Sequence, residues 1–178
     1  GLPSYTDEVI DMAYNCQDGF LYALAYAGMS YEIMRIDLHH ETVETVMTLG
    51  SELVPGFQEA YALACGPDGL LYLIAGSRHS GDEAEYAGLY LMDVTEEAET
   101  TQVFNLGLEL ENSELSAVID QASGTLYFTY YTSQYDTARG ELEEQAVFYS
   151  WNGSELEPLL ELGNIAFDAL ALTGGPDV

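Results

Sequence analysis

The sequence predicts an all-β protein built from repeated sheets of four antiparallel strands, and three observations predict it. First, a Leu-Tyr pair recurs at spacings of 50 and 55 residues, and a Leu-Gly pair recurs at spacings of 57 and 56. Second, each repeat holds four short runs rich in Val, Ile, Tyr and Phe, with turn residues between them. Third, no long segment has helical periodicity. Four strands in a repeat of this length are typical of a β-propeller blade. The repeated pairs are Leu21-Tyr22, Leu71-Tyr72 and Leu126-Tyr127, then Leu49-Gly50, Leu106-Gly107 and Leu162-Gly163.

Alignment of the repeats divides the chain into three complete blades and the start of a fourth. We expect the blades at residues 8–50, 57–107 and 114–163, in one propeller domain over residues 1–178, with 164–178 starting a fourth blade. In the first blade the strands are expected at residues 9–15, 20–26, 31–38 and 42–49. Closed propellers have roughly four to eight blades. We therefore expect a ring completed by association of copies through open blade edges, or a piece of a longer polypeptide.

Tight turns are predicted between the first two strands of each blade. A glycine there follows Asp or Ser, and such pairs supply the positive backbone dihedrals of a short hairpin. The pairs are Asp18-Gly19, Asp68-Gly69 and Ser123-Gly124, with Asn152-Gly153 between the last two strands of the third blade.

Small residues recur on the first strand of every repeat. Innermost strands converge on the propeller axis, where small side chains permit close packing. We therefore expect these alanines to be buried near the axis: Ala13, Ala60, Ala62, Ala64, Ala117, Ala166, Ala169 and Ala171.

The pattern of a glycine turn, Leu-Tyr in an apolar strand, a strand ending in Asp and a closing Leu-Gly resembles extracellular bacterial β-propeller repeats. These include the YVTN and quinoprotein-like repeats and the propellers beside immunoglobulin-like modules in Gram-positive surface proteins. The resemblance implies a scaffold that is secreted or attached to the cell surface, and it implies no activity. The chain departs from WD repeats, since Trp151 is its only tryptophan and no Gly-His…Trp-Asp pair occurs.

The charge is strongly one-sided. Thirty-one acidic residues stand against three arginines and no lysine, which gives a net charge of −28. Such a surface repels phosphate backbones and anionic lipid headgroups, so we expect no nucleic-acid partner and no membrane insertion. No apolar run reaches transmembrane length and no signal peptide is visible. Because the chain begins with Gly, we expect a processed or trimmed piece, from which a leader or anchor could have been lost.

Long connections predict which side of the molecule binds a ligand. The connections between the second and third strands, and from one blade to the next, emerge on one side, which we call the long-loop face. The loops expected there are at residues 51–58, 76–88, 108–113 and 132–145, and long loops in compact domains are often functional. We predict ligand binding by Arg78, His79, Tyr86, Tyr135 and Arg139, with Phe57 in the same loops. Of the other tyrosines, only Tyr31 is expected to reach a ligand. A long solvated loop without function remains an equal alternative.

Metal and catalytic motifs are weak. Asp82, Glu83 and Asp136 could supply the hard oxygen ligands that calcium prefers, without the spacing of an EF-hand loop. We expect no other cofactor. His39 and His40 fall in a predicted turn, where solvent exposure is the favoured interpretation. Cys16 and Cys65 are interpreted as small buried thiols. We predict no catalytic residue.

The leading hypothesis is a non-catalytic extracellular module that binds protein or glycan through the long-loop face. The alternative is a carbohydrate-active hydrolase or lyase that uses the same face. A third hypothesis places the function in blades or domains outside this chain.

Overall fold

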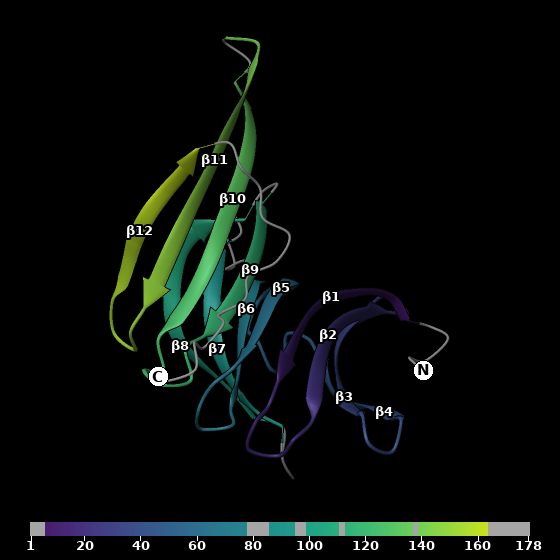
Figure 1. Cartoon of the computed structure of the whole chain (residues 1–178). Coiled ribbons are helices and arrows are strands. Elements are labelled where there is room, and N and C mark those ends of the chain that lie inside the picture. The colour runs from purple at the N-terminus through teal and green to yellow at the C-terminus, as the bar shows by residue number, and fades with distance from the viewer. Residues whose placement is uncertain (1–5, 78–85, 95–98, 111–112, 137–138, 164–178) are drawn as a thin grey trace.

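The computed structural model describes residues 6–77, 86–94, 99–110, 113–136 and 139–163, and within them the chain forms twelve strands and no helix (Figure 1). The strands make three separate four-stranded antiparallel sheets, each from four consecutive strands. In these ranges no helix occurs that is long and apolar enough to cross a membrane. The predicted all-β fold of propeller blades is thus confirmed.

The strand bounds follow the predicted order. The first sheet contains β1 (Thr6–Tyr14), β2 (Leu21–Ala27), β3 (Ser30–Asp37) and β4 (Thr42–Leu49). The second contains β5 (Phe57–Cys65), β6 (Leu71–Ser77), β7 (Tyr86–Asp93) and β8 (Glu99–Glu109). The third contains β9 (Ser113–Ile119), β10 (Leu126–Asp136), β11 (Glu141–Trp151) and β12 (Leu156–Gly163). The expected fourth-blade strand at 164–178 lies outside the described residues.

The first strands of neighbouring sheets pack against one another, β1 on β5 and β5 on β9. Their alanines are at most 8% exposed, which confirms the predicted close packing of small residues on these inner strands. Ala166, Ala169 and Ala171 fall outside the part of the chain that the structure describes. The buried alanines are Ala13, Ala60, Ala62, Ala64 and Ala117.

Two apolar cores join the three sheets in sequence. One core lies between the first and second sheets and includes Tyr22 and Leu71. The other lies between the second and third sheets and includes Leu126 and Trp151. One member of each Leu-Tyr pair is buried in a core, and burial of each such side chain contributes about 1.5–3 kcal/mol to stability.

The hairpin turns after the first strands bind the turns of neighbouring sheets. The Asn15 side-chain amide donates to the Gly69 carbonyl at 3.0 Å, and that of Gln17 donates to the Pro67 carbonyl at 3.0 Å. Gln121 in the third sheet donates to the Cys65 carbonyl at 2.7 Å. These side-chain bonds fix the sheets relative to one another at the end opposite the long-loop face.

The predicted loop at residues 132–145 is wrong, because most of it is strand. β10 and β11 stay paired from Leu126↔Trp151 out to Asp136↔Glu141, whereas β9 pairs with β10 only as far as Thr132 and β12 with β11 only as far as Ala146. The two strands therefore project beyond their sheet as a hairpin arm (Figure 1). Neither face of a two-stranded arm needs an apolar cover, so polar residues that are usual in loops can form it.

The other three predicted loops are also shorter than expected where the structure describes them. β5 begins at Phe57, inside the expected loop at 51–58. β6 continues to Ser77 and β7 begins at Tyr86, so both ends of the expected loop at 76–88 are strand. β8 continues to Glu109, inside the expected loop at 108–113.

Candidate functional site

The residues predicted to bind a ligand are not gathered into one described site. Arg139 is exposed beside the tip of the arm, and its Nη1 lies 2.8 Å from Glu143 Oε1. Tyr135 is on β10 of the third sheet, whereas Tyr86 begins β7 of the second. Arg78 and His79 lie outside the described residues. Ligand binding by these five residues stays a prediction.

The candidate calcium ligands also stay a prediction. Asp82 and Glu83 lie outside the described ranges, and Asp136 ends β10 opposite Glu141. Within the described ranges, no group of three or more His, Cys, Asp and Glu side chains is placed to hold a metal ion.

The histidine pair lies in the exposed turn between β3 and β4, as the sequence predicts. His40 Nδ1 lies 2.6 Å from Asp37 Oδ2. This bond, together with the backbone N–H groups of His40 and His39, lowers the pKa of Asp37 to about 2. The two histidines therefore stabilise the β3–β4 turn by binding the Asp37 carboxylate.

The buried-thiol interpretation is right for Cys65 and wrong for Cys16. Cys65 ends β5 and is 5% exposed, whereas Cys16 is exposed because it comes after the end of β1, in the turn. Burial, with smaller effects of Cys16, Asp18 and Asp68, raises the pKa of Cys65 to about 12.

A pocket of about 600 Å³ opens where the first and second sheets meet. It lies at the β2–β3 turn, the end of β4 and the start of β5, which is the predicted long-loop face. We call it the aromatic pocket. Its lining residues are Glu8, Ile10, Tyr26, Met29, Ser30, Tyr31, Leu49, Phe57, Gln58 and Glu59.

The local sequence explains how one wall of the pocket forms. Gly28 and Met29 have φ angles of 57° and 74°, and two positive φ angles define the tight two-residue turn that joins β2 to β3. This turn places Tyr26 opposite Tyr31. Glu8 lies opposite Tyr26, and Leu49 lies opposite Tyr31. Because directly opposed residues share a face, these four side chains form one row across the first sheet.

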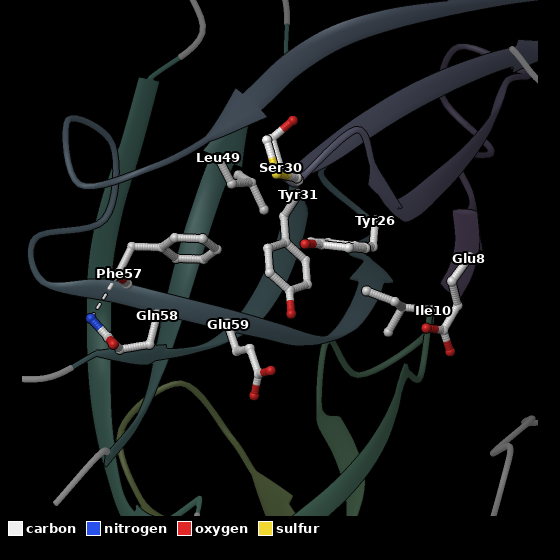
Figure 2. A pocket seen from close by; sticks show the side chains of 10 residues that line it. Glu8, Ile10, Tyr26, Ser30, Tyr31, Leu49, Phe57, Gln58 and Glu59 are labelled. Carbon is white, nitrogen blue, oxygen red and sulfur yellow. Dashed lines mark hydrogen bonds between the residues drawn. The ribbon is translucent and has the colours of Figure 1, made fainter. Parts of the chain in front are cut away.

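Three aromatic rings define the interior of the pocket. The ring centroids of Tyr26 and Tyr31 are 5.1 Å apart, and those of Tyr31 and Phe57 are 5.6 Å apart, with interplanar angles of 59° and 83°. Figure 2 shows the Tyr31 ring between those of Tyr26 and Phe57. Such tilted and edge-to-face pairs hold one another in place, so the wall is formed before a ligand arrives.

Two carboxylates, Glu8 and Glu59, line the pocket, and both residues are exposed. Glu59 Oε2 accepts a hydrogen bond from the Tyr61 hydroxyl at 2.8 Å. Gln58 Nε2 donates to the Gly56 and Phe57 carbonyls at 3.2 and 3.0 Å, and Ser30 Oγ donates to the Ala27 carbonyl at 3.0 Å. The pocket therefore combines aromatic faces with negative charge.

Sequence reasoning found part of this site. The sequence predicts that Tyr31 reaches a ligand and that Phe57 belongs to the long-loop face. Tyr26, Glu8 and Glu59 were missed. Gly28 was an available signal, because a two-residue turn there would pair Tyr26 with Tyr31. The contact of Tyr31 with Phe57 joins two sheets, and no local pattern predicts it.

Comparison with known proteins supports the fold and leaves the activity open. No protein-family model matches the chain, and no curated protein matches it in sequence. A structure of a nidogen/laminin complex covers 88% of this chain at 15% identity and a TM-score of 0.57, with 50% of that chain covered. An α-L-arabinanase from Penicillium chrysogenum, complexed with arabinobiose, covers 93% at 16% identity and a TM-score of 0.56, with 52% of that chain covered.

These two structures are β-propellers, and at such low identity they show the fold alone. The present chain spans about half the length of each. It is a β-propeller-type chain of three described four-stranded sheets.

Proposed function

We propose that this chain is a non-catalytic binding module that holds a protein or glycan ligand at the aromatic pocket of its long-loop face. The observation that carries the proposal is the arrangement of Tyr26, Tyr31 and Phe57 around one opening. Preformed aromatic surface binds a ligand with little loss of conformational freedom. Of the two similar structures described above, one is a complex with another protein and the other a complex with a disaccharide, and the proposal includes both kinds of ligand.

An array experiment tests this proposal. The purified chain and a variant carrying Tyr31→Leu and Phe57→Leu are applied to glycan and peptide arrays. We expect the variant to lose the ligands that the parent chain binds, while far-UV circular dichroism shows the same β structure. Ligands bound equally by both proteins would place recognition elsewhere.

The second candidate is a carbohydrate-active hydrolase or lyase at the same pocket. It is favoured by Glu8 and Glu59, since glycoside hydrolysis uses a pair of carboxylates beside the bound sugar. Each glycan retained on the array is therefore incubated with the chain and its products are analysed. Turnover that Glu8→Gln or Glu59→Gln abolishes would establish the enzyme and overturn the non-catalytic proposal.

Ligand binding by the residues predicted from the sequence, Arg78, His79, Tyr86, Tyr135 and Arg139, is a separate part of this proposal. Arg78→Ala and Arg139→Ala are expected to weaken binding of a ligand found on the arrays. Unchanged affinity of both variants would show that neither arginine contributes to ligand binding. We propose calcium as the ion that Asp82, Glu83 and Asp136 bind. Isothermal titration calorimetry that shows no heat when calcium is added would contradict this proposal.

We also propose that the protein is secreted or displayed on the cell surface, possessing repeats of the YVTN or quinoprotein-like kind found in Gram-positive surface proteins. The support is the repeat pattern of glycine turn, Leu-Tyr and Leu-Gly. Protease treatment of intact cells should degrade the protein. Its complete survival, together with its absence from the culture medium, would contradict this location.

A further inference from the structure

We infer that the aromatic pocket takes a cationic group, the ammonium or guanidinium of a lysine or arginine side chain on a protein partner. The inference rests on the proposed function and narrows it to one class of ligand. Three features of the pocket lead to it.

The first feature is the geometry of the rings. Tyr31 lies between Tyr26 and Phe57, with centroid separations of 5.1 and 5.6 Å (Figure 2). The face of an aromatic ring attracts a cation placed within about 6 Å of its centroid. Rings this close to one another can act on a single bound cation, and they do so more strongly where water is partly excluded.

The second feature is charge. Glu8 and Glu59 line the pocket, and none of its lining residues in the described part of the chain is basic. The whole chain has a net charge of −28, so a basic partner is also attracted from a distance. An anionic ligand would be repelled by the two carboxylates in the pocket and, from a distance, by the net charge of the whole chain.

The third feature is the balance of donors and acceptors. The donors of Gln58 and Ser30 are bound to the backbone carbonyls of Gly56, Phe57 and Ala27. Beside the hydroxyls of Tyr26 and Tyr31, which both donate and accept, the pocket offers the carboxylate oxygens of Glu8 and Glu59 and the ring faces, and both of these attract donors. Lysine and arginine side chains donate hydrogen bonds and accept none, whereas each sugar hydroxyl does both. This excess of acceptors over donors favours a basic side chain over a neutral sugar.

The first sheet already contains one guanidinium in such surroundings. Arg35 Cζ lies 4.8 Å from the centroid of the Phe20 ring, and Arg35 Nε donates to Glu44 Oε1 at 2.6 Å. A ring and a carboxylate together thus hold a cation within this protein. The aromatic pocket offers the same two kinds of group to a cation from outside.

Titration with short peptides tests the inference. The probes are the capped tripeptides Gly-Lys-Gly and Gly-Arg-Gly, with neutral counterparts that carry acetyl-lysine and citrulline. Binding is followed from the amide resonances of the ¹⁵N-labelled chain at physiological ionic strength, where the screening length is about 8 Å. We expect the basic peptides to shift resonances of Ser30, Tyr31 and residues 57–59, and the neutral peptides to leave them unchanged.

Matched variants separate the pocket from the general negative charge. Tyr31→Leu with Phe57→Leu should weaken binding of the basic peptides about fivefold or more, whereas Tyr31→Phe, which keeps the ring, should not. Glu8→Gln with Glu59→Gln should also weaken it. The control, Glu155→Gln with Glu157→Gln, removes the same charge from exposed positions in and beside β12 and should have no effect.

The outcomes distinguish this inference from the proposed function. Neutral peptides that bind as well as the basic ones, or equal losses in the control variant, would overturn the cationic ligand. Basic peptides that shift no resonance at the pocket would overturn it too. If a glycan or neutral peptide from the arrays still depends on Tyr31 and Phe57, the binding module stands without the cation. If no ligand depends on them, the proposed function itself fails.

Discussion

At the scale of single residues, side chains in the turns add hydrogen bonds between the sheets to the contacts of the two apolar cores. Asn15 is buried at 3% exposure and donates both to the Gly69 carbonyl and to Asp18 Oδ2, at 3.0 and 3.1 Å. Its Oδ1 accepts from the backbone N–H of Gln17 at 2.9 Å. One side chain thus shapes its own turn and binds the turn of the next sheet.

Asn15→Ala is therefore expected to destabilise the chain by about 1–3 kcal/mol, because it leaves partly buried backbone groups without partners. The free energy of unfolding is measured by urea titration with far-UV circular dichroism. The control is Gln17→Ala, which removes one exposed bond to the Pro67 carbonyl and should cost about 0.5 kcal/mol or less. Equal costs for the two variants would contradict this account of the turns.

The two cysteines should differ in reactivity. Cys16 is exposed, whereas burial of Cys65 raises its pKa to about 12 and leaves little thiolate at neutral pH. In the folded chain at pH 8, iodoacetamide should modify Cys16 and spare Cys65, as peptide mass spectrometry would show. Both should react in urea. Fast modification of Cys65 in the folded chain would show that the end of β5 opens to solvent.

At the scale of elements, the sequence predicts the strands of the sheets better than the outline of the arm. The Leu-Tyr pairs and Asp-Gly turns identify β2 and β6 because their residues have structural roles: the Tyr22 hydroxyl donates to Asp18 Oδ2 at 2.7 Å within its hairpin. The arm escapes prediction because its two exposed faces give no apolar alternation. The aromatic pocket cannot be predicted from a local sequence pattern either, because its walls come from two different sheets.

The arm is expected to be dispensable for folding. Residues 133–136 and 139–144 lie beyond the pairing of β10 with β9 and of β11 with β12. Replacing residues 133–144 by Asn-Gly should keep the sheet intact and change the free energy of unfolding by about 1 kcal/mol or less, since little buried surface is lost. Fluorescence of Trp151, the only tryptophan, reports unfolding of the third sheet. Loss of cooperative unfolding would show that the arm is part of the core.

At the scale of the whole molecule, three described sheets form an arc with exposed apolar side chains on its outermost sheets. Met12 and Tyr14 on β1 are 55% and 56% exposed, and Leu160 on β12 is 55% exposed. In a closed propeller a neighbouring blade would cover such sides. The net charge of −28 opposes association of copies, so the two effects compete.

We therefore expect self-association that increases with protein concentration and with salt, because salt screens the repulsion and leaves apolar contact effective. Light scattering across a concentration series at low and high salt measures it. Replacing Met12 and Tyr14 by Ser should reduce association. A strictly monomeric, well-folded chain at high concentration in high salt would contradict exposed blade sides.

The central claim is that the long-loop face binds its ligand through the aromatic pocket, and comparison of array profiles tests it most directly. The parent chain is compared with Tyr31→Leu/Phe57→Leu, and a second comparison uses Tyr31→Phe, with folding checked by circular dichroism. The account predicts that the first variant loses the parent's ligands and the second keeps them. A folded Tyr31→Leu/Phe57→Leu variant with the parent's full profile would contradict the claim.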